Sequence, residues 1–269
     1  MHLKPLNFKT QYDGKIMKTD ANNQPLTAIV TGASTGIGLA TAKRFINDGI
    51  NVVMNARTEA DLLNAYNSLD TKNAAMLVGD ISKKSVGQEL VKIAESAFGG
   101  LDILVNNAGV FSAKPFLQTE ESDIDRFHSI NFKGAYFASQ AAVPALQKRG
   151  GGAIINIGTT LLDHAIAGFP ASAALASKAA LHSLTEQLAA EFGNDNIRVS
   201  TIATGIIDTP LHAKHGIEDT SGLAGLHLLN RIGNPEDVAD AVALLSTNDF
   251  ISGTTLRVDG GHAAGHAFS

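Results

Sequence analysis

The fold of this chain is indicated by one glycine-rich segment, Thr31-Gly32-Ala33-Ser34-Thr35-Gly36-Ile37-Gly38. It follows the apolar run Ala28-Ile29-Val30, which is typical of a short buried strand, and it precedes residues 39–45, whose apolar spacing indicates a helix. Gly32 permits a tight turn, and Gly36 lets the backbone approach a ligand closely. Gly38 lets the helix pack against the strand. The free N–H groups of the helix start suit a pyrophosphate. A purely structural turn is the alternative, but the flanking strand and helix favour a dinucleotide site.

The composition favours one domain that binds a small molecule. The chain has 269 residues and a formal net charge of −5, without a basic block that would indicate a nucleic-acid or membrane partner. It contains no cysteine, which is compatible with a reducing compartment, and we expect a cytoplasmic protein. No apolar run reaches the roughly 18 residues of a membrane span.

Short apolar runs alternate with amphipathic stretches along the chain, which predicts an α/β fold in which helices cover both faces of a parallel sheet. The predicted strands are 27–31, 51–55, 75–79, 103–106, 153–157, 198–202 and 255–258. The predicted helices begin near Ile37, Glu59, Ser85, Ser122, Ala135, Ala174 and Pro235. We expect residues 1–26 to be an N-terminal extension, without the apolar segment of a secretory signal, and residues 27–269 to form a single domain.

The end of the second predicted strand indicates which dinucleotide is bound. About 20 residues after the glycine turn, dinucleotide folds place the group that contacts the adenosine ribose. Here Ala56 is followed by Arg57, so a 2′-phosphate would meet a cation instead of the carboxylate that selects NAD. This predicts NADP over NAD, although Arg57 is also compatible with a solvated surface charge. Asp80, after the third strand, is expected either to accept from the adenine amino group or to cap the next helix.

At these positions the chain resembles the short-chain dehydrogenases/reductases, and the resemblance covers about residues 27–262. The glycine stretch is similar to their TGxxxGxG motif, and Asn106-Asn107-Ala108-Gly109 is similar to their NNAG motif. Asn131 matches an active-site Asn, and Lys178 matches the Lys of the YxxxK motif. Further matches are Ile206-Ile207-Asp208-Thr209-Pro210, the run from Arg231 to Val238, and Val258-Asp259-Gly260-Gly261.

The resemblance implies a Rossmann-like, three-layer α/β/α fold and hydride transfer between a nicotinamide and a carbonyl or alcohol carbon of a small molecule. It implies that Asn131, Thr159 and Lys178 are catalytic, that residues 211–230 form a lid, and that helices 135–146 and 175–192 build a homodimer or homotetramer. The implied cofactor-binding residues are Gly32, Ser34, Thr35, Gly36, Ile37, Gly38, Arg57, Asp80, Ile81, Asn107, Ala108, Gly109, Lys178, Ile207 and Thr209.

The chain departs from the family at the residue that transfers the proton. Four residues before Lys178 the family has a Tyr, and this chain has Ala174. Its tyrosines, at positions 12, 66 and 136, are not near that register. Where the family has a Ser after the fifth strand, Thr159 or Thr160 is expected to supply the hydroxyl, and Thr204 stands where the family usually has Pro. The cofactor half of the resemblance therefore carries over better than the proton-transfer half.

Several residues are candidates for the missing acid. Lys178 is favoured, acting through water held by Asn131, and the other candidates are Thr159, Thr160, Ser172 and His164. We expect an NADP(H)-dependent oxidoreductase. The alternatives are an NADP-binding regulator or scaffold without redox activity and a non-redox enzyme on the same fold. His212 and His215 have the i, i+3 spacing of metal ligands, but no third ligand is evident, so no metal is predicted.

Overall fold

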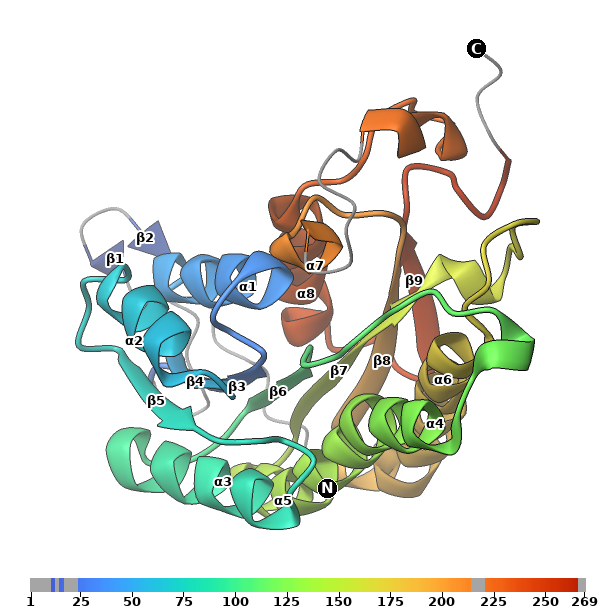
Figure 1. Ribbon diagram of the computed structural model, residues 1–269. Helices are drawn as coiled ribbons and strands as arrows, with labels where there is room; N and C mark the ends of the chain where they lie inside the picture. Colours follow the sequence, from blue (N-terminus) through green and yellow to red (C-terminus); the bar gives the residue numbers. More distant parts are fainter. Residues whose placement is uncertain (1–10, 13–14, 17–23, 214–220, 266–269) are drawn as a thin grey trace.

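A seven-stranded parallel sheet organises the molecule (Figure 1). The computed structural model describes residues 11–12, 15–16, 24–213 and 221–265. The strand order is β5-β4-β3-β6-β7-β8-β9. The strands are β3 (Thr27–Thr31), β4 (Asn51–Ala56), β5 (Ala74–Val78), β6 (Ile103–Asn106), β7 (Gly152–Thr159), β8 (Ile197–Thr204) and β9 (Thr254–Val258).

The order of the strands defines where a ligand binds. From β3 the chain runs outward to β4 and β5, then returns to place β6 on the other side of β3. In open α/β sheets, ligands bind outside the carboxyl ends of the strands at such a reversal. The glycine turn follows β3, and residues 107–109 follow β6, so both lie at this point.

Helices cover both faces of the sheet (Figure 1). One face carries α1 (Gly36–Asn47), α2 (Glu59–Asn67) and α8 (Pro235–Thr247). The other carries α3 (Lys84–Phe98), α5 (Gly134–Arg149) and α6 (Ser172–Phe192), with α4 (Glu121–Phe127) beside α6. A capping box begins α8, where Asn234 and Asp237 satisfy each other's backbone N–H groups and Pro235 occupies the first turn.

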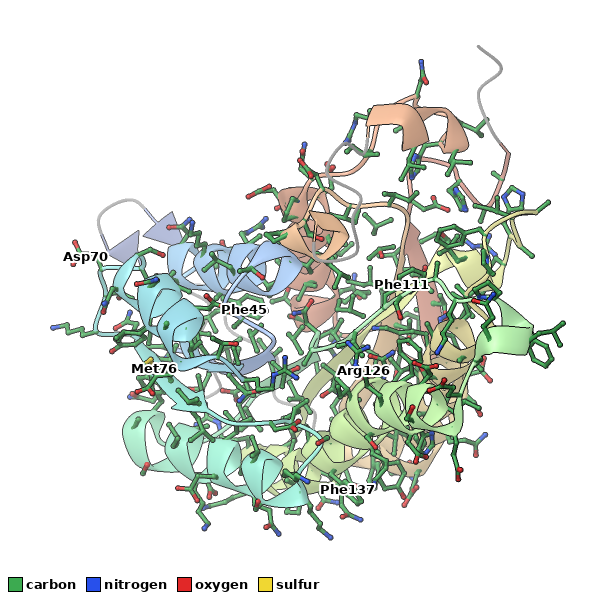
Figure 2. All side chains as sticks on the ribbon, viewed as in Figure 1. Phe45, Asp70, Met76, Phe111, Arg126 and Phe137 are labelled. Atoms are coloured by element: carbon green, nitrogen blue, oxygen red, sulfur yellow. The ribbon has the colours of Figure 1, made fainter. Side chains whose placement is uncertain are left out.

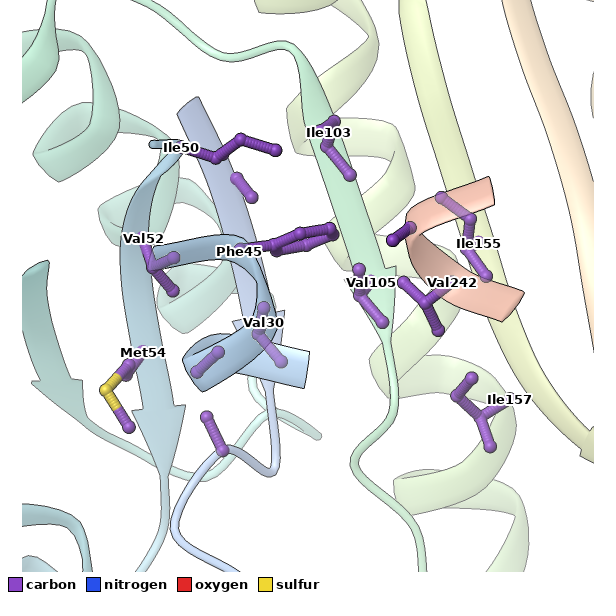
Figure 3. Packing of buried hydrophobic residues seen from close by; sticks show 14 of the residues in the cluster. Val30, Phe45, Ile50, Val52, Met54, Ile103, Val105, Ile155, Ile157 and Val242 are labelled. Atoms are coloured by element: carbon purple, nitrogen blue, oxygen red, sulfur yellow. The ribbon is translucent and has the colours of Figure 1, made fainter. Parts of the chain in front are cut away.

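Each face of the sheet builds its own hydrophobic layer. On the α1 side, Phe45 is fully buried among residues from β3, β4, β6 and α8 (Figure 3). On the other side, Leu104 and Ile154 of the sheet pack with Leu90 and Leu146 of α3 and α5. Strands buried on both faces explain why the sequence has continuous apolar runs here, where a strand with one solvated face would alternate.

The predicted fold class is confirmed. All seven predicted strands are present, each with ends within two residues of the prediction, and the helices begin within two residues of the expected positions. The pairs Gly158↔Ala203 and Thr159↔Thr204 extend β7 and β8 beyond the expected ends. Within the predicted extension, β1 (Gln11–Tyr12) and β2 (Lys15–Ile16) form an antiparallel pair. Among the described residues, no helix combines the length and apolarity needed to cross a bilayer.

Candidate active site

The glycine turn has the backbone that only glycine adopts easily. Gly32 and Gly36 have φ angles of +64° and +52°, in the left-handed region. A Cβ on Gly38 would lie 2.2 Å from the carbonyl oxygen of Gly32, so α1 packs directly on the turn. The side chain of Thr209, from the segment after β8, lies against Gly36. The structure thus brings together two segments that the sequence assigned separately to the cofactor.

Hydrogen bonds clamp the turn to the segment after β6. The Thr31 hydroxyl donates to the Val105 carbonyl and accepts from the backbone N–H groups of Asn107 and Ala108 at 3.0 Å. The Asn107 amide donates to the carbonyls of Thr31 and Gly32. These bonds satisfy buried polar groups of both segments and hold the two segments together.

The start of α1 fits an anionic group. Its first residue is Gly36, and the N-cap residue Thr35 makes no side-chain hydrogen bond to the helix. The first N–H groups of the helix therefore have no side-chain cap, and the helix dipole favours a negative charge there. These residues fit the pyrophosphate of a dinucleotide, as do the glycines, which leave the backbone uncovered.

The expected adenosine end lies at the carboxyl ends of β4 and β5. Arg57 directly follows β4, is exposed, and makes no hydrogen bond or ion pair with another described residue. Asp80 accepts from the backbone N–H of Ser82 at 3.0 Å. Because α3 begins only at Lys84 after the N-cap residue Lys83, Asp80 forms a turn before the helix and is not its cap. Ile81 is buried against Gly134.

Lys178 places an amine at the carboxyl end of β7. Its Nζ donates to the carbonyl oxygen of Ile157 at 2.7 Å. A Cβ on Gly109 would lie 3.1 Å from this Nζ and 3.2 Å from Asn131 Oδ1, so a side chain there would press on both groups. The side chain as a whole is half-buried, but its amine is enclosed, and burial lowers the pKa of Lys178 to about 8.

Asn131 occupies a short π-helical segment, η2 (His128–Lys133), between α4 and α5. Such segments are rare and are found frequently at functional sites. The Asn131 amide nitrogen donates to the Val110 carbonyl and to Ser177 Oγ, both at 2.9 Å. Its Oδ1 accepts from the Val110 N–H at 2.8 Å. Asn131 therefore joins the segment after β6 to α6, and its remaining acceptor capacity is on the side of Gly109 and Lys178.

Sequence reasoning missed Ser177. This buried hydroxyl accepts from Asn131 and donates to the carbonyl oxygen of Ala174 at 2.6 Å. It thereby fixes the orientation of the Asn131 amide. Its position next to Lys178, on the helix expected to carry catalytic residues, was the available signal.

Ala174 is buried, with 1% of its surface exposed, so the position that carries a phenol in the family here packs a methyl group.

The two threonines at the end of β7 have different environments. Thr160 is fully buried and donates to the Thr204 carbonyl, which commits its hydroxyl to the fold. Thr159 is partly exposed, and its Oγ1 accepts from the Leu161 N–H at 3.3 Å. Of the two, Thr159 keeps its hydroxyl proton for another partner.

The other candidate acids are held differently. His164 Nδ1 lies 3.0 Å from the carbonyl oxygen of His262, so the ring is bonded to the C-terminal segment. Ser172 is the first residue of α6 and is exposed, within the helix instead of preceding it. His215 lies outside the described residues, as does the side chain of His212. Across the part of the chain that is described, no three His, Cys, Asp or Glu side chains are arranged to hold a metal ion.

The segment after β6 and the segment before α6 contact each other. The rings of Phe111, after β6, and Phe169, before α6, stack with centroids 5.8 Å apart and an interplanar angle of 12° (Phe111 is labelled in Figure 2). The backbone N–H of Lys114 donates to the Pro170 carbonyl at 2.7 Å. The stacked rings form an apolar surface, and aromatic side chains commonly line small-molecule sites.

Known proteins are similar to this chain over most of its length. A family model described as enoyl-(acyl carrier protein) reductase matches residues 32–263. The chain is 35% identical over 244 residues to 3beta-hydroxysteroid dehydrogenase 1 of Eggerthella lenta, covering 87% of this chain and 92% of that protein. It is 32% identical over 219 residues to an uncharacterized oxidoreductase of Staphylococcus aureus, covering 80% and 88%. The crystal structure of a putative short-chain alcohol dehydrogenase from Sinorhizobium meliloti superposes with a TM-score of 0.81 at 33% identity, covering 89% and 97%. The chain therefore belongs to the short-chain dehydrogenase/reductase family, whose enzymes are NAD(P)H-dependent oxidoreductases.

Proposed function

We propose that this protein is an NADP(H)-dependent oxidoreductase that interconverts a carbonyl and an alcohol and uses Lys178 in place of the family's Tyr as the proton-transferring group. The observation that carries this proposal is the enclosed Lys178 amine, bonded to Ile157 and adjacent to Asn131 through the space that Gly109 leaves. When bound, the nicotinamide cofactor supplies or accepts the hydride.

The chain's own residues would hold the cofactor at three points. The N–H groups at the start of α1 would bind the pyrophosphate, Arg57 would bind a 2′-phosphate, and Thr209, which lies against Gly36, would contact the cofactor beside the turn. A phosphate–guanidinium contact is a charge-assisted hydrogen bond, about twice as strong as a neutral one. The unpaired, exposed Arg57 therefore supports a preference for NADP.

Proton transfer would use the amine directly or through one water. Hydride addition to a carbonyl carbon leaves an alkoxide, which takes a proton from the Lys178 ammonium, and the resulting neutral amine is reprotonated from solvent. A pKa of about 8 suits this role. Near neutral pH the amine is protonated before the reaction, and it readily takes up a new proton after it has donated one. Asn131 and the Thr159 hydroxyl are polar partners for the water or for the substrate oxygen.

The substrate is expected to be a ketone or secondary alcohol on an apolar body. The stacked Phe111 and Phe169 provide an apolar surface, and one of the relatives is named as a 3beta-hydroxysteroid dehydrogenase. We therefore include 3-ketosteroids with smaller ketones and aldehydes among the substrates to be tested.

The proposal is tested by following NADPH and NADH oxidation with this panel, for native protein and for the Ala174→Tyr and Lys178→Met variants. We expect native protein to turn over a substrate. The turnover rate of Lys178→Met should be lower by about 10²–10⁴-fold, because one well-placed acid is removed. Turnover that persists in Lys178→Met would refute the role of the amine. A faster Ala174→Tyr enzyme would mean that the pocket still fits the family's phenol.

The burial of Ala174 also favours a second candidate, an NADP-binding protein without redox activity. In that case NADPH binds by calorimetry, but neither native protein nor Ala174→Tyr oxidises it with any member of the panel. The two candidates are therefore separated by the same set of measurements.

A further inference from the structure

Three histidines from separate parts of the chain meet at the carboxyl edge of the sheet. His164 follows β7, His227 comes after β8 and directly follows the segment η5 (Ser221–Leu226), and His262 follows β9. The ring centroids of His164 and His262 are 5.2 Å apart, and those of His227 and His262 are 5.5 Å apart. His227 and His262 are each 1% exposed. We call these three residues the histidine cluster.

Backbone hydrogen bonds fix the protons on the two buried rings. The Ile206 N–H donates to His227 Nε2 at 3.1 Å, so this nitrogen is unprotonated and the neutral ring carries its proton on Nδ1. His262 Nδ1 lies 3.0 Å from the carbonyl oxygen of Leu226, which only accepts, so His262 also carries its proton on Nδ1. Both rings are thereby assigned the same tautomer by their partners.

Each buried ring has one nitrogen left over, and the two are complementary. Both His227 Nδ1, a donor, and His262 Nε2, an acceptor, are buried, and neither has a hydrogen-bond partner among the described residues. A buried polar group without a hydrogen bond lowers the stability of the folded protein. A buried water with two or more polar neighbours usually supplies the missing hydrogen bonds. A water between the rings would accept from His227 and donate to His262.

We propose that the histidine cluster is a proton-sensitive clasp that holds the lid segment 226–230 to the C-terminal segment 259–265 while His262 is neutral. In the closed clasp, a bridging water joins the two rings, and the Leu229 N–H donates to the Gly260 carbonyl at 3.0 Å. Protonation of His262 places a charge in the buried cluster and removes the acceptor of the bridge, so the two segments separate.

The groups around His262 compensate its protonated form only in part. His227 and His164 are the titratable groups against its ring, and both would repel a cation once charged. The carboxylate of Asp259 is directed to the backbone, accepting from Gly261 and Ala263. Asp163, next to His164, is paired with Arg257 at 2.9 Å. Burial accordingly lowers the pKa of His262, although Asp259 and the Leu226 carbonyl oppose this.

The lowered pKa of His262 determines how the stability of the clasp changes with pH. His262 binds a proton less readily in the closed clasp than when released, where its pKa is near 6.5. The clasp is therefore stable above about pH 6.5 and weakens as the pH falls. This holds whether or not the protein turns over a substrate, so the test is independent of the proposed function.

Amide hydrogen exchange across pH 5–8 tests the clasp, with the Leu229 amide as reporter and rates corrected for intrinsic exchange. In native protein we expect protection of Leu229 to fall by up to about tenfold per pH unit below pH 6.5, as one proton is taken up. His262→Gln, which donates to Leu226 but does not titrate, should abolish this slope. His128→Gln, at an exposed histidine outside the cluster, should leave it unchanged.

A second measurement on native protein covers the case in which His262→Gln does not fold. Nitrogen-15 shifts of the imidazoles should report protons on Nδ1 of both His227 and His262 at pH 8, with His262 becoming doubly protonated only below its ordinary pKa. A proton on His262 Nε2 at pH 8, a pH-independent Leu229 amide, or an equal slope in His262→Gln would overturn the proposal.

Discussion

At the scale of single residues, enclosing the Lys178 amine lowers the stability of the folded protein and gives the amine a pKa that suits proton transfer. The pKa of Lys178 falls from 10.5 to about 8 because its amine is enclosed, so the unfolded chain binds the proton more tightly than the folded one. The cost is fully present below about pH 8 and disappears as the pH rises toward 10.5.

Lys178→Met should therefore raise the free energy of unfolding at pH 7, by about 1–2 kcal/mol after allowance for the half-buried side chain and the lost bond to Ile157. Urea unfolding at pH 7 and pH 10 measures this, and the gain should shrink at pH 10. Lys43→Met, at an exposed lysine of α1, is the matched control and should change stability little at either pH. A variant less stable than native protein at pH 7 would contradict the assignment of a costly buried amine.

Arg57 carries the prediction of cofactor preference. Because it is exposed and unpaired among the described residues, its guanidinium is free to bind a 2′-phosphate, and Arg57→Ala should reduce the NADPH-to-NADH affinity ratio about tenfold or more. Calorimetric titration of both cofactors measures the ratio. Arg126→Ala, at an exposed arginine of α4, should not alter it. If native protein binds both cofactors equally, the preference is wrong.

At the scale of elements, the turn between β3 and α1 has no room for a side chain. A Cβ on Gly38 would lie 2.2 Å from the Gly32 carbonyl oxygen and 2.6 Å from Asn107 Nδ2, so the helix or the clamp must shift. We expect Gly38→Ala to lower the free energy of unfolding by about 1–3 kcal/mol and to weaken NADPH binding. At Gly193, nothing lies within 4 Å of an added Cβ, so Gly193→Ala should do neither. Normal NADPH binding by Gly38→Ala would contradict the placement of the cofactor.

The elements themselves could be predicted from sequence because their signals are local. Buried parallel strands have continuous apolar runs, and the glycine turn and Asn107 belong to motifs that keep their spacing. The π-helical turn at Asn131 has no such signal, since it depends on how α4 and α5 join. The histidine cluster was not predicted for the same reason: His164, His227 and His262 are distant in sequence and meet only because β7, β8 and β9 are neighbours in the sheet.

At the scale of the whole molecule, we expect a symmetric homo-oligomer built on α5 and α6. Both helices contain many small residues, which permit close helix packing, and Tyr136 of α5 leaves 40% of its surface exposed. Light scattering at micromolar concentration should give the mass of a dimer or a tetramer. Tyr136→Glu, which adds a charge to this face, should shift the mass toward the monomer, whereas a monomeric native protein would contradict the expectation.

Proton transfer by the Lys178 amine, without a tyrosine, should appear in the pH dependence of kcat for carbonyl reduction with saturating NADPH. Reduction needs the protonated amine, so kcat should be constant at lower pH and fall as the pH rises through about 8, and Lys178→Met should lose both the rate and this fall in kcat. A native profile without a fall near pH 8, or the same fall in Lys178→Met, would show that the Lys178 amine does not transfer the proton.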